Sequence, residues 1–148
     1  MSKLHFEDVE VGSRHDCGTY TVTAEEIVGI GEQFDPQPYH VDETVATEQF
    51  GGLIASAVHT LGICQRLVTE ALFHRVVTNA GAGFDEVNCH APVFAGDTLS
   101  VTAEILDKRQ LESQPERGLV RVEYTARNQD GELVMTAVAL PFFQVRGE

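Results

Sequence analysis

The sequence predicts an α+β fold in which a curved, five-stranded antiparallel sheet wraps around one long central helix. Three observations support this prediction. Apolar residues recur at helical spacing from about 53 to 77, the first half of that stretch carries no charge, and the C-terminal half of the chain alternates apolar and polar residues. One sheet cannot cover a helix that is apolar all round, so we expect the sheet to curl and a second subunit to complete the enclosure.

The first strand is expected at 17–23, and a short helix at 24–34 follows it. Thr23 and Glu26 have the spacing of a capping box, in which Glu26 reaches back to the first turn. Pro36 then ends the helix, because a proline disfavours helical backbone in the residue before it.

Asp42 can cap a second short helix that runs to about Gln49, and two glycines then break the chain. The long helix follows, from Leu53 to about Val77. We expect its first half to be buried nearly all round and the part beyond Gln65 to be half-solvated.

The remaining elements are strands, which alternation and turn signals define. A polar loop is expected from about Asp107 to Gly118, and Asp130-Gly131 marks a turn. The last strand is so apolar that we expect both of its faces to be covered, one by the helix and the other by a partner. The four expected strands lie at residues 84–92, 98–105, 120–127 and 133–145.

The 148 residues fit a single domain spanning 1–148, and the net charge of −13 argues against a nucleic-acid partner. A few arginines could converge on a small phosphorylated ligand, although solvated surface is the alternative. The N-terminus has no apolar run like that of a signal peptide, and no stretch reaches the length of a membrane span, so we expect a cytoplasmic protein. Three widely spaced cysteines and scattered histidines predict no disulfide framework, no metal and no cofactor.

The stretch Phe34-Asp-Pro-Gln-Pro-Tyr-His40 places a carboxylate and an imidazole on a stiff loop. Fully extended, the segment would span roughly 15 Å, so it must curl back near Tyr39 if Asp35 and His40 are to share one water. Such a pair suits proton transfer near neutral pH. The alternative is structural: Asp35 would bond loop amides and His40 would pack at a helix start.

Four pieces in a fixed order carry a resemblance: Asp35-x-x-Pro38-x-His40, then Asp42, then Phe50-Gly-Gly-Leu-Ile-Ala-Ser56, then Pro92-Val-x-x-Gly-Asp-Thr-Leu99. Together they resemble the MaoC-like dehydratases, or (R)-specific enoyl-CoA hydratases, of the hot-dog superfamily. The resemblance covers almost the whole chain. It implies a hot-dog fold, a homodimer or dimer of dimers, and reversible addition of water to a trans-2-enoyl thioester carried by coenzyme A or acyl carrier protein.

By the same resemblance, Asp35 is the base that deprotonates the attacking water, and His40 holds that water and helps to deliver a proton to C2. Gln37, Ser56 and Ala57 are the expected substrate-binding residues, with a backbone amide at Ala57 or Ser56 stabilising the thioester oxygen. Two positions depart from the family pattern, which usually has Asn at 37 and commonly Gly at 57.

Two further questions stay open in the sequence. His59 and Thr60 could line an acyl or pantetheine tunnel, but packing inside the core is the alternative for His59; Leu61 and Phe94 are other possible tunnel residues. The rival functions are a hot-dog thioesterase, which commonly has a carboxylate on the central helix, and a non-catalytic acyl-thioester binding subunit. The helix here has no acidic residue before Glu70, which favours hydration.

Overall fold

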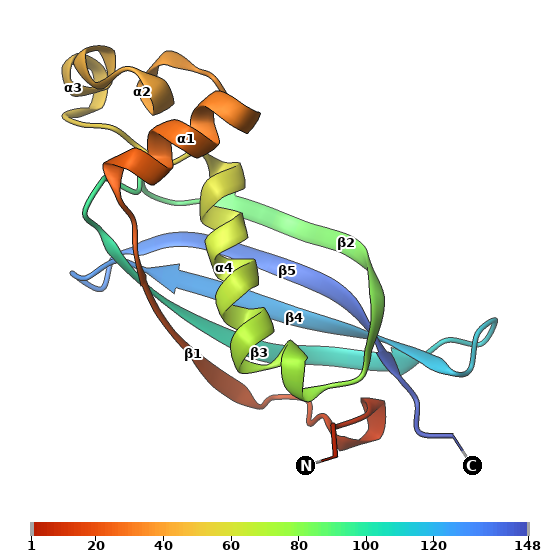
Figure 1. Cartoon of the computed structure of the whole chain (residues 1–148). Helices are drawn as coiled ribbons and strands as arrows, with labels where there is room; N and C mark the ends of the chain where they lie inside the picture. Colours follow the sequence, from red (N-terminus) through yellow and green to blue (C-terminus); the bar gives the residue numbers. More distant parts are fainter. Residues whose placement is uncertain (1, 148) are drawn as a thin grey trace.

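The structure, a computed structural model that describes residues 2–147, has the α+β architecture that the sequence predicts (Figure 1). All strand pairs are antiparallel, in the order β1-β3-β4-β5-β2. The strands are β1 (Arg14–Thr21), β2 (Thr78–Cys89), β3 (Thr98–Gln110), β4 (Arg117–Arg127) and β5 (Leu133–Gln144). The helices are α1 (Ala24–Phe34), α2 (Pro38–Val41), α3 (Glu43–Phe50) and α4 (Ala57–Ala71), with short 3-10 turns η1 (Phe6–Asp8) and η2 (Phe73–Arg75).

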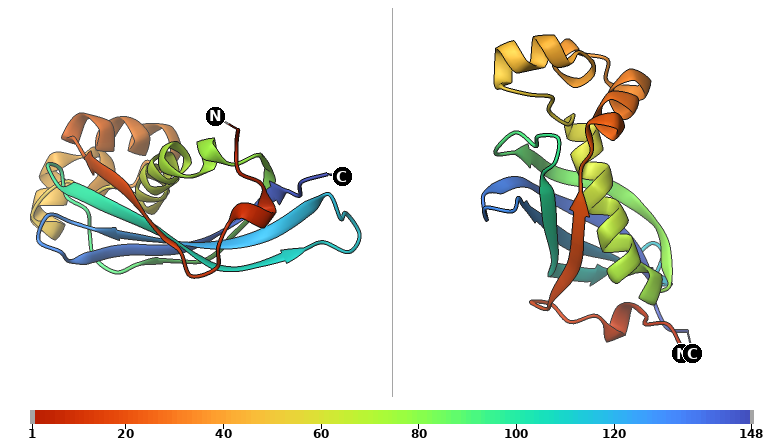
Figure 2. Two further views of the ribbon diagram at one scale, coloured as in Figure 1. Left: turned by 90° about the horizontal axis from the view of Figure 1, so that it is seen from below. Right: turned by 60° about the vertical axis from the view of Figure 1, so that its left-hand side comes forward.

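The sheet curves, and α4 lies along its inner face (Figures 1 and 2). The three short helices gather beyond the end of the sheet where α4 begins, and η1 and the last residues of β5 lie toward the opposite end. The core fills the space between α4 and the sheet with alternate strand residues, such as Val101, Ile105 and Val122, which are fully buried. Contacts of α4 with the sheet are mostly with β1 and β3, so its β2 side is less covered.

Two of the helices begin where the sequence predicts, because each has a capping side chain. The Thr23 hydroxyl accepts from the Glu26 amide at the start of α1, and Asp42 accepts from the amides of Thr44 and Val45 at the start of α3. The second half of the predicted capping box is wrong: the Glu26 carboxylate turns away from the cap and bonds side chains of other elements.

The predicted long helix from Leu53 to Val77 is too long at both ends. Its first four residues are extended, because Ile54 pairs with Phe94 in an isolated antiparallel bridge and the Ala55 amide donates to the Val93 carbonyl at 2.8 Å. Ser56 then caps α4 by accepting from the His59 amide. Apolar spacing alone could not separate this extended segment from a helical turn.

In the single chain, the sheet does not enclose the helix on all sides. Ala57, Val58 and Gly62 are exposed along one side of its first half, with Val58 at 56%. The last strand, β5, lies inside the sheet between β4 and β2, and its residues are buried or half-buried in the single chain. That a partner covers the second face of this strand stays a prediction.

The strand ends differ from the sequence prediction mainly by length. The hairpin between β3 and β4 leaves only residues 111–116 outside the strands, and β1 and β2 both begin earlier than expected. β2 is one of the two edge strands, it is almost entirely exposed, and it carries three register shifts against β5. Ala80 and Glu86 on β2 have left-handed backbone, with φ values of 59° and 51°, which bends the strand locally.

The N-terminal turn η1 is held against the sheet by one aromatic ring. Phe6 packs directly over Gly118 on β4, so closely that a methyl group at position 118 would overlap the ring. Lys108 also contacts Phe6. Its Nζ lies 4.7 Å from the ring centroid and donates to the Phe6 carbonyl oxygen at 2.9 Å.

We expect Gly118→Ala to lower the free energy of unfolding by about 1–3 kcal/mol, because the added methyl overpacks a buried contact. The same substitution in a Phe6→Ala background should cost far less, since the ring it meets is gone. Chemical denaturation of the two single variants and the double variant measures this coupling. Equal cost in both backgrounds would show that Phe6 is not what excludes a side chain at 118.

Candidate active site

Asp35 and His40, which the sequence nominates as an acid-base pair, lie next to each other. Asp35 is the C-terminal cap of α1, with its amide donating to the Gly31 carbonyl at 2.8 Å. The chain then turns back through α2, so that Asp35 Oδ2 and His40 Nε2 are 3.4 Å apart. The predicted loop is right for Asp35 and wrong for His40, because Pro38 starts a short helix that contains the histidine.

One backbone carbonyl fixes the orientation of the His40 ring. Nδ1 donates to the Ile54 carbonyl oxygen at 2.7 Å, and the side chain is 6% exposed. Since Nδ1 holds a proton for this bond, the nitrogen that faces Asp35 is the one free to gain or lose a proton. Asp35 is 24% exposed. The carboxylate is therefore partly open to solvent, whereas the imidazole beside it is buried.

Gln37 completes this loop. Its side-chain Nε2 donates to Asp35 Oδ1 at 2.9 Å, and the Tyr39 hydroxyl donates to its Oε1. The amide therefore engages one carboxylate oxygen and leaves the other beside His40. This gives Gln37 a contact with the candidate base; the predicted contact with substrate stays a prediction.

Close approach of α1 to α2 depends on a glycine. A Cβ at Gly31 would lie 3.0 Å from His40 Cβ and from Val41 Cγ1, and 3.3 Å from the His40 carbonyl oxygen. Gly29, two residues earlier on the same helix, has nothing within 4 Å of the corresponding position. The backbone contact at Gly31 thus sets how near α1 comes to the histidine.

The start of α4 offers free amide donors beside a cavity. Ser56 is buried and its hydroxyl caps the helix, so this hydroxyl already has a partner. Within residues 2–147, no group accepts from the amides of Ala57 and Val58, as expected for the first helical turn. Ala57, Thr60 and Ile54, whose carbonyl holds His40, line a cavity of about 350 Å³. Leu61 and Phe94 do not line it.

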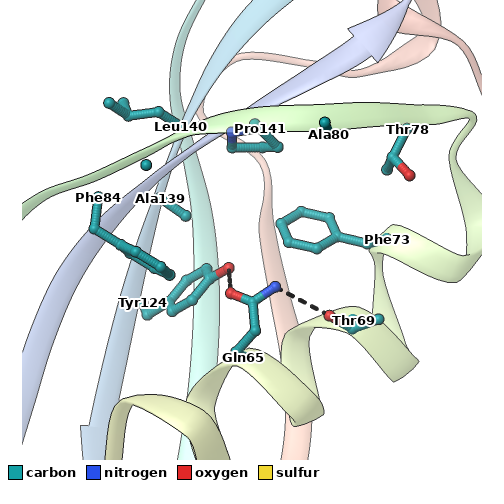
Figure 3. Close-up of a pocket in the computed structure, with 12 residues that line it drawn as sticks. Gln65, Thr69, Phe73, Thr78, Ala80, Phe84, Tyr124, Ala139, Leu140 and Pro141 are labelled. Atoms are coloured by element: carbon teal, nitrogen blue, oxygen red, sulfur yellow. Dashed lines mark hydrogen bonds between the residues drawn. The ribbon is translucent and has the colours of Figure 1, made fainter. Parts of the chain in front are cut away.

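A second cavity, of about 400 Å³, lies farther along the β2 side of α4 (Figure 3). Figure 3 shows Gln65 pointing into it from α4: its Oε1 accepts from the Tyr124 hydroxyl at 2.7 Å, and its Nε2 donates to Thr69 at 3.2 Å. Burial raises the pKa of Tyr124, so its hydroxyl stays neutral. Phe73, Phe84 and other apolar side chains form most of the remaining wall.

On the β1 side of α4, three polar side chains form a cluster that was not predicted from the sequence. Glu26 of α1 accepts from the Tyr20 hydroxyl of β1 and from His59 Nε2 of α4, the latter at 2.6 Å. Burial raises the pKa of the Glu26 carboxyl, but the bonds from Tyr20 and His59 outweigh it and hold that pKa below its usual value. No local pattern signals a cluster whose members are up to 39 residues apart.

None of the helices among residues 2–147 is long and apolar enough to cross a membrane. In the same part of the chain, no three side chains of His, Cys, Asp or Glu are grouped in a way that would hold a metal ion.

Comparisons with known proteins agree with the resemblance. The model of the family described as MaoC like domain matches residues 10–128. The Bacillus subtilis (strain 168) protein YdeM is 30% identical over 127 residues, which are 85% of this chain and 89% of YdeM.

Solved structures of similar proteins have the same fold. The crystal structure of a MaoC-like dehydratase from Rhodospirillum rubrum matches with a TM-score of 0.86 and 35% identity, covering 98% of this chain and 99% of that one. The (R)-hydratase PhaJ1 from Pseudomonas aeruginosa matches with a TM-score of 0.76 and 21% identity, covering 97% and 88%.

We expect Gly31→Ala to lower the free energy of unfolding by about 1–3 kcal/mol, because the new methyl must displace the side chains of His40 and Val41. Gly29→Ala is the matched control on the same helix. It should raise stability by up to about 1 kcal/mol, since alanine is the better helix former and meets nothing. Denaturant titration of both variants compares them, and equal effects would mean that α1 and α2 are not in tight contact.

Proposed function

The chain belongs to the MaoC-like dehydratase family, and from this premise we propose that it adds water reversibly to a trans-2-enoyl thioester to give an (R)-3-hydroxyacyl thioester. The observation that carries the proposal is the Asp35 and His40 pair, held 3.4 Å apart next to the start of α4. The (R) configuration follows from the family and not from this geometry. Coenzyme A and acyl carrier protein are the two carriers that the family implies.

In the proposed hydration, Asp35 accepts a proton from the water as the water oxygen bonds to C3 of the substrate. His40 Nε2 holds that water and helps to deliver a proton to C2. The proton that Asp35 takes from the water passes to His40 Nε2, 3.4 Å away, and from there to C2, so both groups return to their starting states. The bond from His40 Nδ1 to Ile54 keeps the ring from turning during these steps.

The thioester oxygen gains negative charge as water adds, and the first turn of α4 supports a site for it. The Ala57 amide has no acceptor among residues 2–147, and it lies at the positive end of a 15-residue helix. Ser56 contributes to this site through the helix cap, because its hydroxyl is engaged with the His59 amide. Alanine in place of the usual glycine at 57 leaves the amide in place.

An acyl chain bound with its thioester at Ala57 would extend over the β2 side of α4, where both cavities lie. The cavity at Gln65 and Tyr124 is mostly apolar, as an acyl tail requires (Figure 3). We therefore include Thr60 and Gln65 among the residues that contact the acyl group.

Thioesterase activity has less support in this chain. The first carboxylate on α4 is Glu70, which lies at the far end of the helix, is exposed, and pairs with Arg66. It lies 13 residues beyond Ala57, roughly 20 Å along the helix at 1.5 Å per residue, which is too distant to act on the same thioester.

We expect Asp35→Asn and His40→Ala to reduce hydration of crotonyl-CoA roughly 10²–10⁴-fold, because each removes a proton-transfer group. Loss of absorbance at the enoyl-thioester band measures the rate. Glu32→Gln, an exposed carboxylate one turn earlier on α1, is the matched control and should keep wild-type activity.

The same assay includes a longer trans-2-enoyl-CoA and a saturated acyl-CoA. Release of free thiol from the saturated substrate would identify a thioesterase instead. Tight binding of the enoyl thioesters without turnover would identify a non-catalytic binding subunit.

We further propose that the chain forms a homodimer through β2. This strand is one of the two edges of the sheet, and it exposes Phe84 and Val87 at 41% and 40%. An exposed apolar edge strand is a ready surface for a second chain. A partner there would also cover the two cavities on the same side of α4.

Val87→Lys should weaken the dimer at least about tenfold in Kd, because a charge would be buried against the partner strand. Val11→Lys, which changes a valine that is 54% exposed in the turn just before β1, is the control and should leave the dimer intact. Sedimentation analysis across a concentration series measures both. A Kd that Val87→Lys does not change would place the interface elsewhere.

A further inference from the structure

We propose that Glu26 and His59 are positioning residues, whose bond sets where Asp35 lies relative to the Ala57 amide. This proposal rests on the proposed function, because it concerns the site of that reaction. Neither residue touches the reacting atoms. Each lies on a helix that carries one half of the site.

The argument begins with the two helices. Glu26 lies in the first turn of α1, and Asp35 caps the same helix about 13 Å farther along. His59 lies in the first turn of α4, two residues after Ala57. A bond of 2.6 Å between Glu26 and His59 therefore joins the helix that positions the base to the helix that positions the oxyanion donor.

Few apolar side chains pack between these helices, so few contacts other than the bond between Glu26 and His59 fix the distance between them. A cavity of about 400 Å³ lies between them, lined by Ile30 and Phe34 from α1 and by Val58 and Gly62 from α4. Phe34 is 63% exposed, although it directly precedes Asp35. Where side chains do not fill the space, a directional polar contact decides the distance between the helices.

The cluster also holds its own members in place. Glu26 receives a second hydrogen bond, from the Tyr20 hydroxyl, which ties the carboxylate to β1. His59 is 6% exposed, and its Nδ1 is buried without a partner among residues 2–147. A buried nitrogen without a hydrogen-bond partner is unfavourable. The ring is held in this orientation by the bond that its other nitrogen, Nε2, makes to Glu26.

Two conservative substitutions at His59 distinguish the role of Nε2 from that of Nδ1. Gln at position 59 puts a donor near the place of Nε2 and can keep the bond to Glu26, whereas Asn puts its amide near the place of Nδ1 and cannot reach. We expect Glu26→Ala and His59→Asn to lower kcat for enoyl-CoA hydration about 10- to 100-fold, because a displacement near 1 Å can cost that much. KM and the shape of the pH profile should change little. His59→Gln should stay within about threefold of wild type.

Controls test whether one bond is responsible. Glu25→Ala removes the neighbouring exposed carboxylate on α1 and should have no effect. The double variant Glu26→Ala/His59→Asn should be no slower than either single variant, since both break the same contact. Full activity in His59→Asn, equal loss in His59→Gln and His59→Asn, or multiplied losses in the double variant would each overturn the proposal.

A second measurement does not depend on activity. Amide hydrogen exchange across residues 31–42 reports how firmly the Asp35 and His40 segment is held. We expect faster exchange there in Glu26→Ala and His59→Asn, and wild-type rates in His59→Gln and Glu25→Ala. Unchanged exchange in the first two variants overturns the positioning role. Absence of hydration in the wild type, with these exchange differences present, would overturn the proposed function alone.

Discussion

The hydrogen bond from His40 Nδ1 to the Ile54 carbonyl is the interaction on which the site depends. It exists because residues 53–55 are extended and paired with the segment around Val93, which turns the Ile54 carbonyl toward α2. The same break lets α4 begin at Ala57 with unpaired amides. One short departure from helical structure therefore fixes the histidine and also creates the donors for a developing negative charge.

Local signals predicted much of the fold. Thr23 and Asp42 marked helix starts correctly because a capping side chain acts within one turn of backbone, and period-two alternation identified the strands because one face is buried. The start of α4 was missed, although Ser56 is a good capping residue, because Leu53 and Ile54 fit the helical spacing. Their burial comes from the bridge to the segment around Phe94, which sequence spacing does not reveal.

The candidate site was predictable to a similar degree. Asp35 and His40 are five residues apart, so their chemistry could be read from one short motif. The contact between Glu26 and His59 could not, because it joins residues 33 positions apart on two helices whose relative placement comes from the whole fold. The two sides of α4 differ in chemistry: a polar cluster of Tyr20, Glu26 and His59 crosses the β1 side, whereas two cavities line the β2 side.

The irregular backbone of β2 has a consequence for assembly. An edge strand with regular pairing can add strand after strand and grow into a fibre. β2 instead has three register shifts and left-handed residues at Ala80 and Glu86, which interrupt its free row of amides and carbonyls. A regular strand therefore pairs poorly along the whole of this edge. The irregularities thus protect the protein from open-ended aggregation while leaving closed, pairwise association available.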